Sequence, residues 1–212
     1  MSSIEEGFEF LSLPESYTTA DWQKEDLDYL IGRQYSANWS EMGCRKTTTG
    51  LWLAGNKTIA LQEGNENGIK PIVLIVTTKS GKGTYFDAIP KCNLPFAKVF
   101  DIDATGADVM EFVGDQIFRF PLDPVHFWDA SKQEKLPGPT LILAHYHCFM
   151  NKSKMLPFLK KLPYAMIIID EAHRIKEKDN QWTRNIKALN CWTGYKHVMT
   201  GTGFINRPQE MW

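Results

Sequence analysis

Two adjacent carboxylates, Asp170 and Glu171, follow a run of apolar residues and precede His173. The apolar run over 165–169 has no polar alternation, which predicts a buried parallel strand. Ligands bind at the carboxyl ends of such strands, so Asp170 is placed to hold a magnesium ion and Glu171 to orient or deprotonate an attacking water. This is the chemistry of a Walker B motif in nucleoside-triphosphate hydrolysis. Two acids after a strand also occur in ordinary loops, and the pair alone leaves both interpretations open.

A phosphate-binding loop is the partner that such an acidic motif requires, and residues 40–48 are the candidate. The segment reads Ser-Glu-Met-Gly-Cys-Arg-Lys-Thr-Thr and lies between a predicted strand and a predicted helix. Lys46 is placed to reach the outer phosphates, and the Thr47 hydroxyl is placed to bind magnesium. Arg45 departs from the P-loop pattern, which has glycine before the lysine, because it brings a Cβ and a long side chain into a tight turn. The alternative is an amphipathic helix that begins with a surface Arg-Lys pair.

A third segment with small hydroxyl residues, Thr200-Gly-Thr202, follows the last predicted strand. Hydroxyl groups at a strand end can contact both an acidic motif and the phosphates of a nucleic acid. Taken by itself, the segment is better explained as a glycine-rich turn after an edge strand.

Length and composition indicate a globular chain without a basic surface overall. The 212 residues suit one large domain, and 24 basic against 25 acidic residues leave a net charge of −1. This balance excludes a histone-like binder, although it permits a local basic groove. The four cysteines form no C-x-x-C pair and are expected to be free thiols in a reducing compartment. Because no signal peptide and no apolar run of roughly 20 residues is present, we expect a cytoplasmic protein (host cytoplasm if viral) with no membrane partner.

Apolar segments that alternate with helical ones predict an α/β fold with a mainly parallel sheet flanked by helices. Strands are expected at 35–39, 72–76, 97–102, 140–144, 166–169 and 196–199, and helices near 18–32 and 47–60. The inner side of the first helix is expected to carry Trp22, Leu27, Tyr29, Leu30 and Ile31. Residues 104–138 fit this pattern least well, since 108–120 could form a hairpin that turns at Gly114-Asp115 or a short helix and a strand.

In their order and spacing, the three segments resemble the first RecA-like lobe of superfamily 2 helicases, nearest the Swi/Snf-like DNA translocases of phage or prokaryotic type. Residues 170–176 resemble the family's motif II in its DEAH form, and residues 200–212 resemble motif III and the segment after it. Three weaker likenesses involve the adenine-contacting opening segment, motif Ia and motif Ib, at 17–30, 71–80 and 141–146. The resemblance covers 17–212, with 1–16 as a lead-in and 104–138 as a variable insertion.

The resemblance implies a RecA-like P-loop NTPase that uses ATP and Mg²⁺ and acts as a DNA-dependent ATPase and translocase. Glu171 would activate water, Lys46 would hold the phosphates, and His173 would couple this site to motif III. Magnesium would be bound by Asp170 and Thr47. The nucleotide would contact Gln23, Gly43, Cys44, Arg45, Lys46, Thr47 and Thr48. A nucleic-acid backbone, DNA rather than RNA, would lie near Lys79, Ser80, His145, Tyr146, Thr200 and Thr202.

The chain departs from the family pattern in four places. Arg45 replaces a glycine, Gly203 replaces a proline, and His147 stands where glutamate is common. The sequence stops at Trp212, before the second RecA-like lobe with its arginine finger, which is the expected partner. An arginine finger contributes about 10³–10⁵ in rate in related systems, so the chain alone is expected to be nearly inactive. Two alternatives remain open: a catalytically impaired scaffold that binds nucleic acid or protein, and a P-loop kinase or other NTPase unrelated to DNA.

Several side chains outside these motifs have plainer interpretations. His126 is expected to be a packed or capping histidine, without partners at metal-ligand spacing. The indoles of Trp39, Trp52 and Trp192 are expected to fill core or interface space. A basic helix face that is solvated by default is expected from Lys152, Lys154, Lys160 and Lys161.

Overall fold

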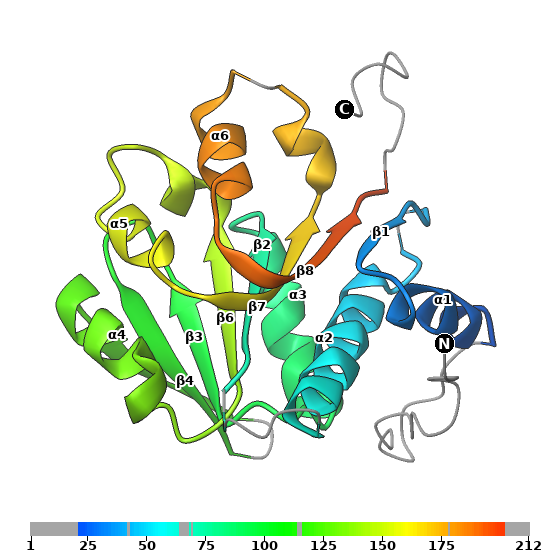
Figure 1. Cartoon of the computed structure of the whole chain (residues 1–212), viewed down its shortest axis with the longest axis horizontal. Helices are drawn as coiled ribbons and strands as arrows, with labels where there is room; N and C mark the ends of the chain where they lie inside the picture. The colour runs from blue at the N-terminus through cyan, green and yellow to red at the C-terminus, as the bar shows by residue number, and fades with distance from the viewer. Residues whose placement is uncertain are drawn as a thin grey trace.

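An eight-stranded sheet with helices on both sides organises the chain (Figure 1). The computed structural model describes residues 21–41, 43–63, 68, 70–113, 116–177 and 179–201. The strand order is β1-β8-β7-β2-β6-β3-β4-β5, and all pairings from β1 to β3 are parallel, whereas β4 pairs antiparallel with β3 and β5. The predicted RecA-like α/β fold with a mainly parallel sheet is therefore confirmed.

The strands and helices alternate along most of the chain. The strands are β1 Tyr35–Asn38, β2 Ile72–Thr77, β3 Lys98–Ile102, β4 Ala107–Val113, β5 Gln116–Leu122, β6 Thr140–His145, β7 Tyr164–Asp170 and β8 Cys191–Met199. The α-helices are α1 Asp21–Ile31, α2 Lys46–Glu63, α3 Gly81–Ala88, α4 Pro124–Ser131, α5 Leu156–Leu159 and α6 Gln181–Lys187. Short 3₁₀ helices are η1 Ile89–Lys91, η2 Gln133–Lys135, η3 Tyr146–Phe149 and η4 Ala172–Ile175.

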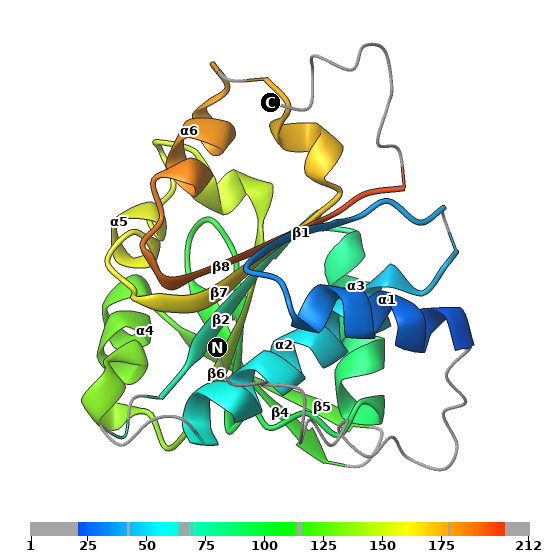
Figure 2. The same cartoon turned by 45° about the vertical axis from the view of Figure 1, so that its right-hand side comes forward.

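Two hydrophobic clusters lie on opposite faces of the sheet. In β2, Ile72, Leu74 and Val76 point into one cluster, and Val73 and Ile75 point into the other, because successive side chains of a strand alternate between faces. Helices α1, α2 and α3 cover one face, and α4, α5 and α6 cover the other (Figures 1 and 2). The central strands are buried on both faces, which explains why their sequences are continuously apolar.

Helix α1 buries Leu27, Leu30 and Ile31 as predicted, but not the two aromatic residues assigned to the same side. Its buried side carries Gln23, Leu27, Leu30 and Ile31, and it packs against α2. Trp22 and Tyr29 were expected on this side but are 40% and 59% exposed. Helical spacing explains the difference, because residues 23, 27, 30 and 31 share one side and residues 22 and 29 fall outside it.

Residues 104–138, which fit the sequence pattern least well, contain a hairpin. Strands β4 and β5 pair antiparallel from Ala107↔Leu122 to Val113↔Gln116, which confirms the hairpin and not the alternative of a short helix and a strand. The expected turn at Gly114-Asp115 lies outside the described residues. Helix α4 follows, and the Asp123 side chain caps it by accepting hydrogen bonds from the backbone N–H groups of Val125 and His126 at 2.9 and 2.8 Å.

The histidine and tryptophan predictions hold only in part. The His126 side chain is 72% exposed and lies 3.1 Å from an Asp123 carboxylate oxygen, so Asp123 forms the cap and the histidine is not packed. Trp52 is 2% exposed and belongs to the core as predicted. Trp39 and Trp192 are 46% and 44% exposed and do not belong to the core, so the alternative of an interface position stays a prediction for both.

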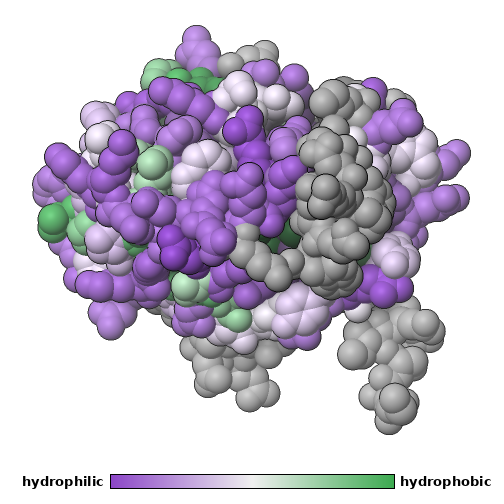
Figure 3. All heavy atoms as spheres, turned by 90° about the horizontal axis from the view of Figure 1, so that it is seen from above, coloured by the Kyte–Doolittle hydropathy of each residue, from purple (hydrophilic) through white to green (hydrophobic). Residues whose placement is uncertain are grey.

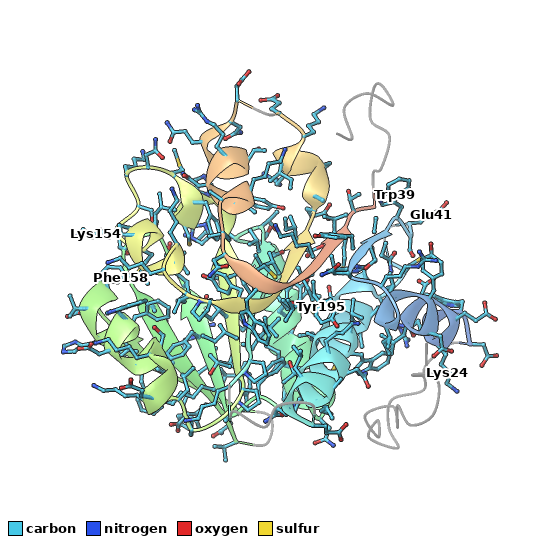
Figure 4. All side chains as sticks on the ribbon, viewed as in Figure 1. Lys24, Trp39, Glu41, Lys154, Phe158 and Tyr195 are labelled. Atoms are coloured by element: carbon cyan, nitrogen blue, oxygen red, sulfur yellow. The ribbon has the colours of Figure 1, made fainter. Side chains whose placement is uncertain are left out.

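The predicted basic helix face does not exist. Lys152 and Lys154 lie in the loop before α5, and Lys160 and Lys161 follow its end. Helix α5 has four residues, Leu156–Leu159, too few to align four lysines. In Figure 4, Lys154 and Phe158 lie at the side of the molecule opposite Trp39 and Glu41, which lie in the loop after β1.

The cysteines and the helix lengths bear on two further expectations from the sequence. Cys44, Cys92, Cys148 and Cys191 are all free thiols. Among the residues that the structure describes, no helix combines the length and apolarity that a membrane crossing needs.

Candidate functional site

The three sequence segments singled out for their chemistry meet at one edge of the sheet. Because β1, β8, β7, β2 and β6 are parallel, their carboxyl ends all lie at the edge drawn uppermost in Figure 1. The loop before α2 follows β1, the two acids end β7, and Thr200 follows β8. Strand β8 lies between β1 and β7, so Thr200 stands between the loop and the acids.

Asp170 is held at the end of β7 by two hydrogen bonds. Its Oδ2 accepts from Thr77 Oγ1 at 2.9 Å, and its Oδ1 accepts from the backbone N–H of Glu171 at 2.9 Å. Burial raises the pKa of Asp170, and the Thr77 bond opposes that rise. Glycine at position 81 leaves room for this hydroxyl, since a Cβ there would lie 2.5 Å from Thr77 Oγ1. A fixed carboxylate with hard oxygen donors suits a Mg²⁺ ion.

Glu171 and His173 connect the acidic motif to the end of β8. Glu171 has left-handed backbone angles, φ 53° and ψ 47°, which are uncommon for a non-glycine residue. The His173 Nδ1 lies 3.2 Å from a Glu171 carboxylate oxygen and 3.3 Å from Thr200 Oγ1. The structure thus places His173 between the acid and the threonine that the sequence analysis expected it to connect.

The loop before α2 curls around the ammonium group of Lys46. Lys46 Nζ donates to the carbonyl oxygens of Ser40 and Glu41 at 2.8 and 2.7 Å. Gly43 and Arg45 both have positive φ, +84° and +45°, so the arginine adopts the left-handed conformation that favours glycine. This lysine stands at the start of the helix and bonds two loop carbonyls. It is therefore positioned to exchange those carbonyls for phosphate oxygens.

A backbone hydrogen bond joins this loop to β8. The Thr200 N–H donates to the carbonyl oxygen of Asn38 at 3.0 Å. The Asn38 side chain in turn accepts from the backbone N–H and the hydroxyl of Ser40 at 2.9 and 2.6 Å. A continuous set of contacts therefore runs from Glu171 through His173 and Thr200 to the start of the loop.

The other residues predicted to contact the nucleotide differ in how far they are exposed. Cys44 and Thr47 lie in the loop and the first turn of α2 and are half-buried, whereas Thr48 is buried. Gln23 is fully buried on the inner side of α1, so no surface of its side chain is open to an adenine. The side chain of α1 that reaches the loop is Asp26, whose carboxylate accepts from Asn38 and Ser40 at 3.4 and 3.5 Å. Nothing in the sequence marked Asp26 for this contact.

The predicted nucleic-acid residues divide into exposed and buried ones. Lys79 and Ser80 are exposed between β2 and α3. His145 and Tyr146 are 4% and 2% exposed, which does not favour direct contact with a phosphate backbone. His145 lies with Nε2 2.6 Å from Asp103 Oδ1, while its Nδ1 accepts from a backbone N–H. Thr202 lies outside the described residues, as do Gly203 and the segment that follows.

The described residues include no cluster of three or more His, Cys, Asp or Glu side chains arranged around a metal ion. At the carboxyl edge, Asp170 and Thr47 carry oxygen atoms of the kind that Mg²⁺ takes as ligands.

Comparisons with known proteins identify relatives of the chain. The SNF2-related domain matches residues 41–212. Over 200 residues the chain is 22% identical to Protein CHROMATIN REMODELING 5 of Arabidopsis thaliana, covering 92% of this chain and 10% of that protein. A segment of 54 residues, 26% of this chain, is 39% identical to 5% of the probable chromatin-remodeling complex ATPase chain of Oryza sativa subsp. japonica.

A solved structure shares the fold. The SWI2/SNF2 ATPase core of Sulfolobus solfataricus in complex with dsDNA superposes with a TM-score of 0.59 at 18% identity. The match covers 95% of this chain and 36% of that one. This chain therefore spans about a tenth of the Arabidopsis protein and about a third of the Sulfolobus chain. The predicted likeness to phage or prokaryotic proteins stays a prediction.

Proposed function

The chain belongs to the SNF2-related domain family, and we propose that it is the ATP-binding lobe of a DNA-dependent ATPase and translocase. The observation that carries this proposal is the continuous set of contacts at the carboxyl edge of the sheet. It links the Lys46 loop, Thr200, His173 and Glu171, and Asp170 lies beside it. If residues 40–48 were only a helix start and residues 170–171 only a loop, this set of contacts between the two segments would not be expected.

The proposed chemistry assigns each group a task that its position allows. Lys46 exchanges the carbonyls of Ser40 and Glu41 for phosphate oxygens of ATP. Asp170 and Thr47 hold Mg²⁺, which neutralises charge on the phosphate oxygens when bound. Glu171 orients or deprotonates the attacking water. His173 contacts both this carboxylate and the Thr200 hydroxyl, so that a movement of the carboxylate also moves Thr200.

The proposed partners are DNA and a second RecA-like lobe of the same protein. The Sulfolobus ATPase core is in complex with dsDNA, and the exposed Lys79 and Ser80 are available for phosphate contacts in this chain. Since one lobe supplies only one side of a two-sided site, we expect the 212-residue chain alone to turn over ATP slowly. Four free thiols agree with a reducing compartment such as the cytoplasm.

Titration with a fluorescent ATP analogue and Mg²⁺ tests the proposal. The analogue should bind the wild-type chain, and Lys46→Ala should weaken binding by about tenfold or more, since it removes a charged phosphate ligand. Asp170→Asn should remove the Mg²⁺ dependence of binding. Lys91→Ala is the matched control, because Lys91 is an exposed lysine of η1, beyond the far end of α3 from the site. Turnover with DNA at the rate of a complete motor would contradict the expected weak activity of the chain alone.

Arg45 favours a second candidate function, a scaffold with the same fold that binds nucleic acid or protein without ATP. Its positive φ places a non-glycine residue in the turn where the phosphates would lie. Duplex binding together with no analogue binding at millimolar concentration would establish the scaffold. An NTPase unrelated to DNA would instead bind the analogue and ignore the duplex.

A further inference from the structure

A pocket opens beside the acidic motif, on the β2 side of β7. It measures about 510 Å³ and is lined by Thr78, Lys79, Ser80, Tyr146, His147 and Arg174. Lys79 and Arg174 are exposed cations, and Thr78 and Ser80 add hydroxyl groups. The edge of the molecule seen from above is largely hydrophilic (Figure 3). Two cations and two hydroxyls suit a phosphate oxygen of a nucleic-acid backbone.

Tyr146 connects this pocket to the catalytic strand end. It is 2% exposed, and its hydroxyl donates to the carbonyl oxygens of both Asp170 and Glu171, the second at 3.2 Å. Burial raises the pKa of Tyr146 far above its ordinary value, so the hydroxyl keeps the proton that it donates. The phenol ring packs beside the Trp182 indole, with ring centroids 5.6 Å apart, and His147 packs on the same indole at 5.3 Å.

The backbone of Arg174 bonds the same carbonyl as part of the first turn of η4. Its backbone N–H donates to the carbonyl oxygen of Glu171 at 3.0 Å, while its side chain lines the pocket. Two pocket residues therefore hold one peptide group, and that group belongs to the residue with the left-handed backbone. Such a conformation costs on the order of 1–3 kcal/mol and persists only when its surroundings hold it.

We propose that Tyr146 is a positioning residue that couples a DNA phosphate bound in this pocket to the orientation of Glu171. The inference rests on the proposed function and adds the route by which DNA reaches the ATP site. A phosphate that engages Lys79 and Arg174 draws the pocket walls together. Since Tyr146 and Arg174 both bond the Glu171 carbonyl, the movement changes the angle at which the Glu171 carboxylate faces His173.

The His173 ring reports this orientation without requiring ATP turnover. Its Nδ1 lies 3.2 Å from the Glu171 carboxylate, so a change at Glu171 alters the chemical environment of the ring. The experiment is an NMR titration of the full 212-residue chain with a short blunt DNA duplex. The His173 ring signal is assigned by its loss in His173→Gln. We expect the duplex to shift this signal in the wild type and to leave it in place in Tyr146→Phe, which loses only the hydroxyl.

Tyr164→Phe is the matched control. Tyr164 is also fully buried, and its hydroxyl donates to a backbone carbonyl, that of Leu159, at 2.8 Å. It lies at the amino end of β7, away from the acids, so this variant should keep the duplex-induced shift. Arg174→Gln is the second test variant, because it removes the pocket cation but keeps the backbone N–H. It should also lose the shift, even if Tyr146→Phe fails to fold.

The outcomes separate this inference from the function on which it rests. A wild-type His173 shift in folded Tyr146→Phe, or in Arg174→Gln, with the duplex bound would overturn the coupling and leave the proposed function standing. A duplex that binds to no form of the chain would overturn both. Loss of the shift in Tyr164→Phe would show that any buried hydroxyl matters equally, and it would overturn the specific role of Tyr146.

Discussion

At the residue scale, the candidate site contains two residues whose backbones adopt conformations that their residue types disfavour. Arg45 and Glu171 both have positive φ, +45° and +53°, and each stands at a point of the site where chemistry is proposed. Non-glycine residues in this region carry strain of about 1–3 kcal/mol. At Glu171, hydrogen bonds from Tyr146 and Arg174 to the carbonyl offset the strain. At Arg45, the carbonyl accepts from the N–H groups of Thr48 and Thr49 in the first turn of α2.

Replacing Arg45 with glycine should relieve strain in this loop. Glycine adopts positive φ freely but loses about 0.5–1 kcal/mol through its larger entropy in the unfolded chain. We therefore expect Arg45→Gly to raise the free energy of unfolding by about 1 kcal/mol and to tighten binding of a fluorescent ATP analogue. Urea unfolding and analogue titration measure the two effects. Arg45→Ala separates their causes, because it removes the long side chain and keeps the Cβ. Weaker analogue binding in Arg45→Gly would show that the arginine assists the site.

The residues proposed to carry chemistry stand out in the sequence, but the residues that hold them in place do not. Asp170, Glu171 and His173 are recognisable because they follow an apolar strand in a dense local motif. Thr77 is not, because its bond to Asp170 spans 93 positions along the chain and becomes visible only when β2 and β7 are paired. Tyr146 was noticed, but for exposure to nucleic acid, whereas it is buried and faces the acids.

At the element scale, prediction was definite for the strands that are buried on both faces and left two alternatives open for the segment that forms β4 and β5. Strands β2, β6 and β7 have continuously apolar interiors, and polar residues appear only at their ends. Strand β5 is an edge strand whose Phe118 and Phe120 are 44% and 48% exposed. Apolar residues that face solvent remove the periodicity on which a strand prediction depends, so a helix and a hairpin remained equally good for this segment.

The junction of β1 and β8 should make stability depend on pH through His197. This side chain is 1% exposed, and its Nδ1 lies 2.7 Å from Ser36 Oγ. Burial lowers the pKa of His197 to about 4, against an ordinary value of 6.5. Between pH 6.5 and about 4, His197 is therefore protonated in the unfolded chain and neutral in the folded chain. This contribution to stability is present above pH 6.5 and is lost as the pH falls toward 4, by about 2 kcal/mol between pH 7.5 and 5.

Urea unfolding at several pH values tests the role of His197. His197→Asn should flatten the dependence between about pH 7.5 and 5, because asparagine keeps a polar partner for Ser36 and does not titrate. His126→Asn is the control, since the His126 side chain is 72% exposed and should leave the dependence unchanged. Equal pH dependence in wild type and His197→Asn would mean that other groups govern it.

At the scale of the whole molecule, one edge of one sheet carries both proposed binding sites. The Lys46 loop follows β1, and the pocket with Lys79 follows β2, with β8 and β7 between them. Both sites contact the end of β7, through Thr200 and His173 on one side and through Tyr146 and Arg174 on the other. A shared rigid strand end is the physical requirement for two ligands to influence each other.

We therefore expect the nucleotide and DNA to strengthen each other's binding by the same factor. Thermodynamic linkage requires that the factor by which DNA changes nucleotide affinity equals the factor by which the nucleotide changes DNA affinity. Allosteric couplings typically change an affinity by about 5–150-fold. Titrating a fluorescent ATP analogue with and without a DNA duplex gives one factor, and fluorescence anisotropy of a labelled duplex with and without Mg²⁺ and the analogue gives the other. Lys46→Ala should bind the duplex as the wild type does without nucleotide. An analogue concentration that changes duplex binding in the wild type should change it much less in this variant, because the variant binds the analogue about tenfold or more weakly. If both factors equal one in the wild type, β7 transmits nothing, and the two sites are independent neighbours on one sheet.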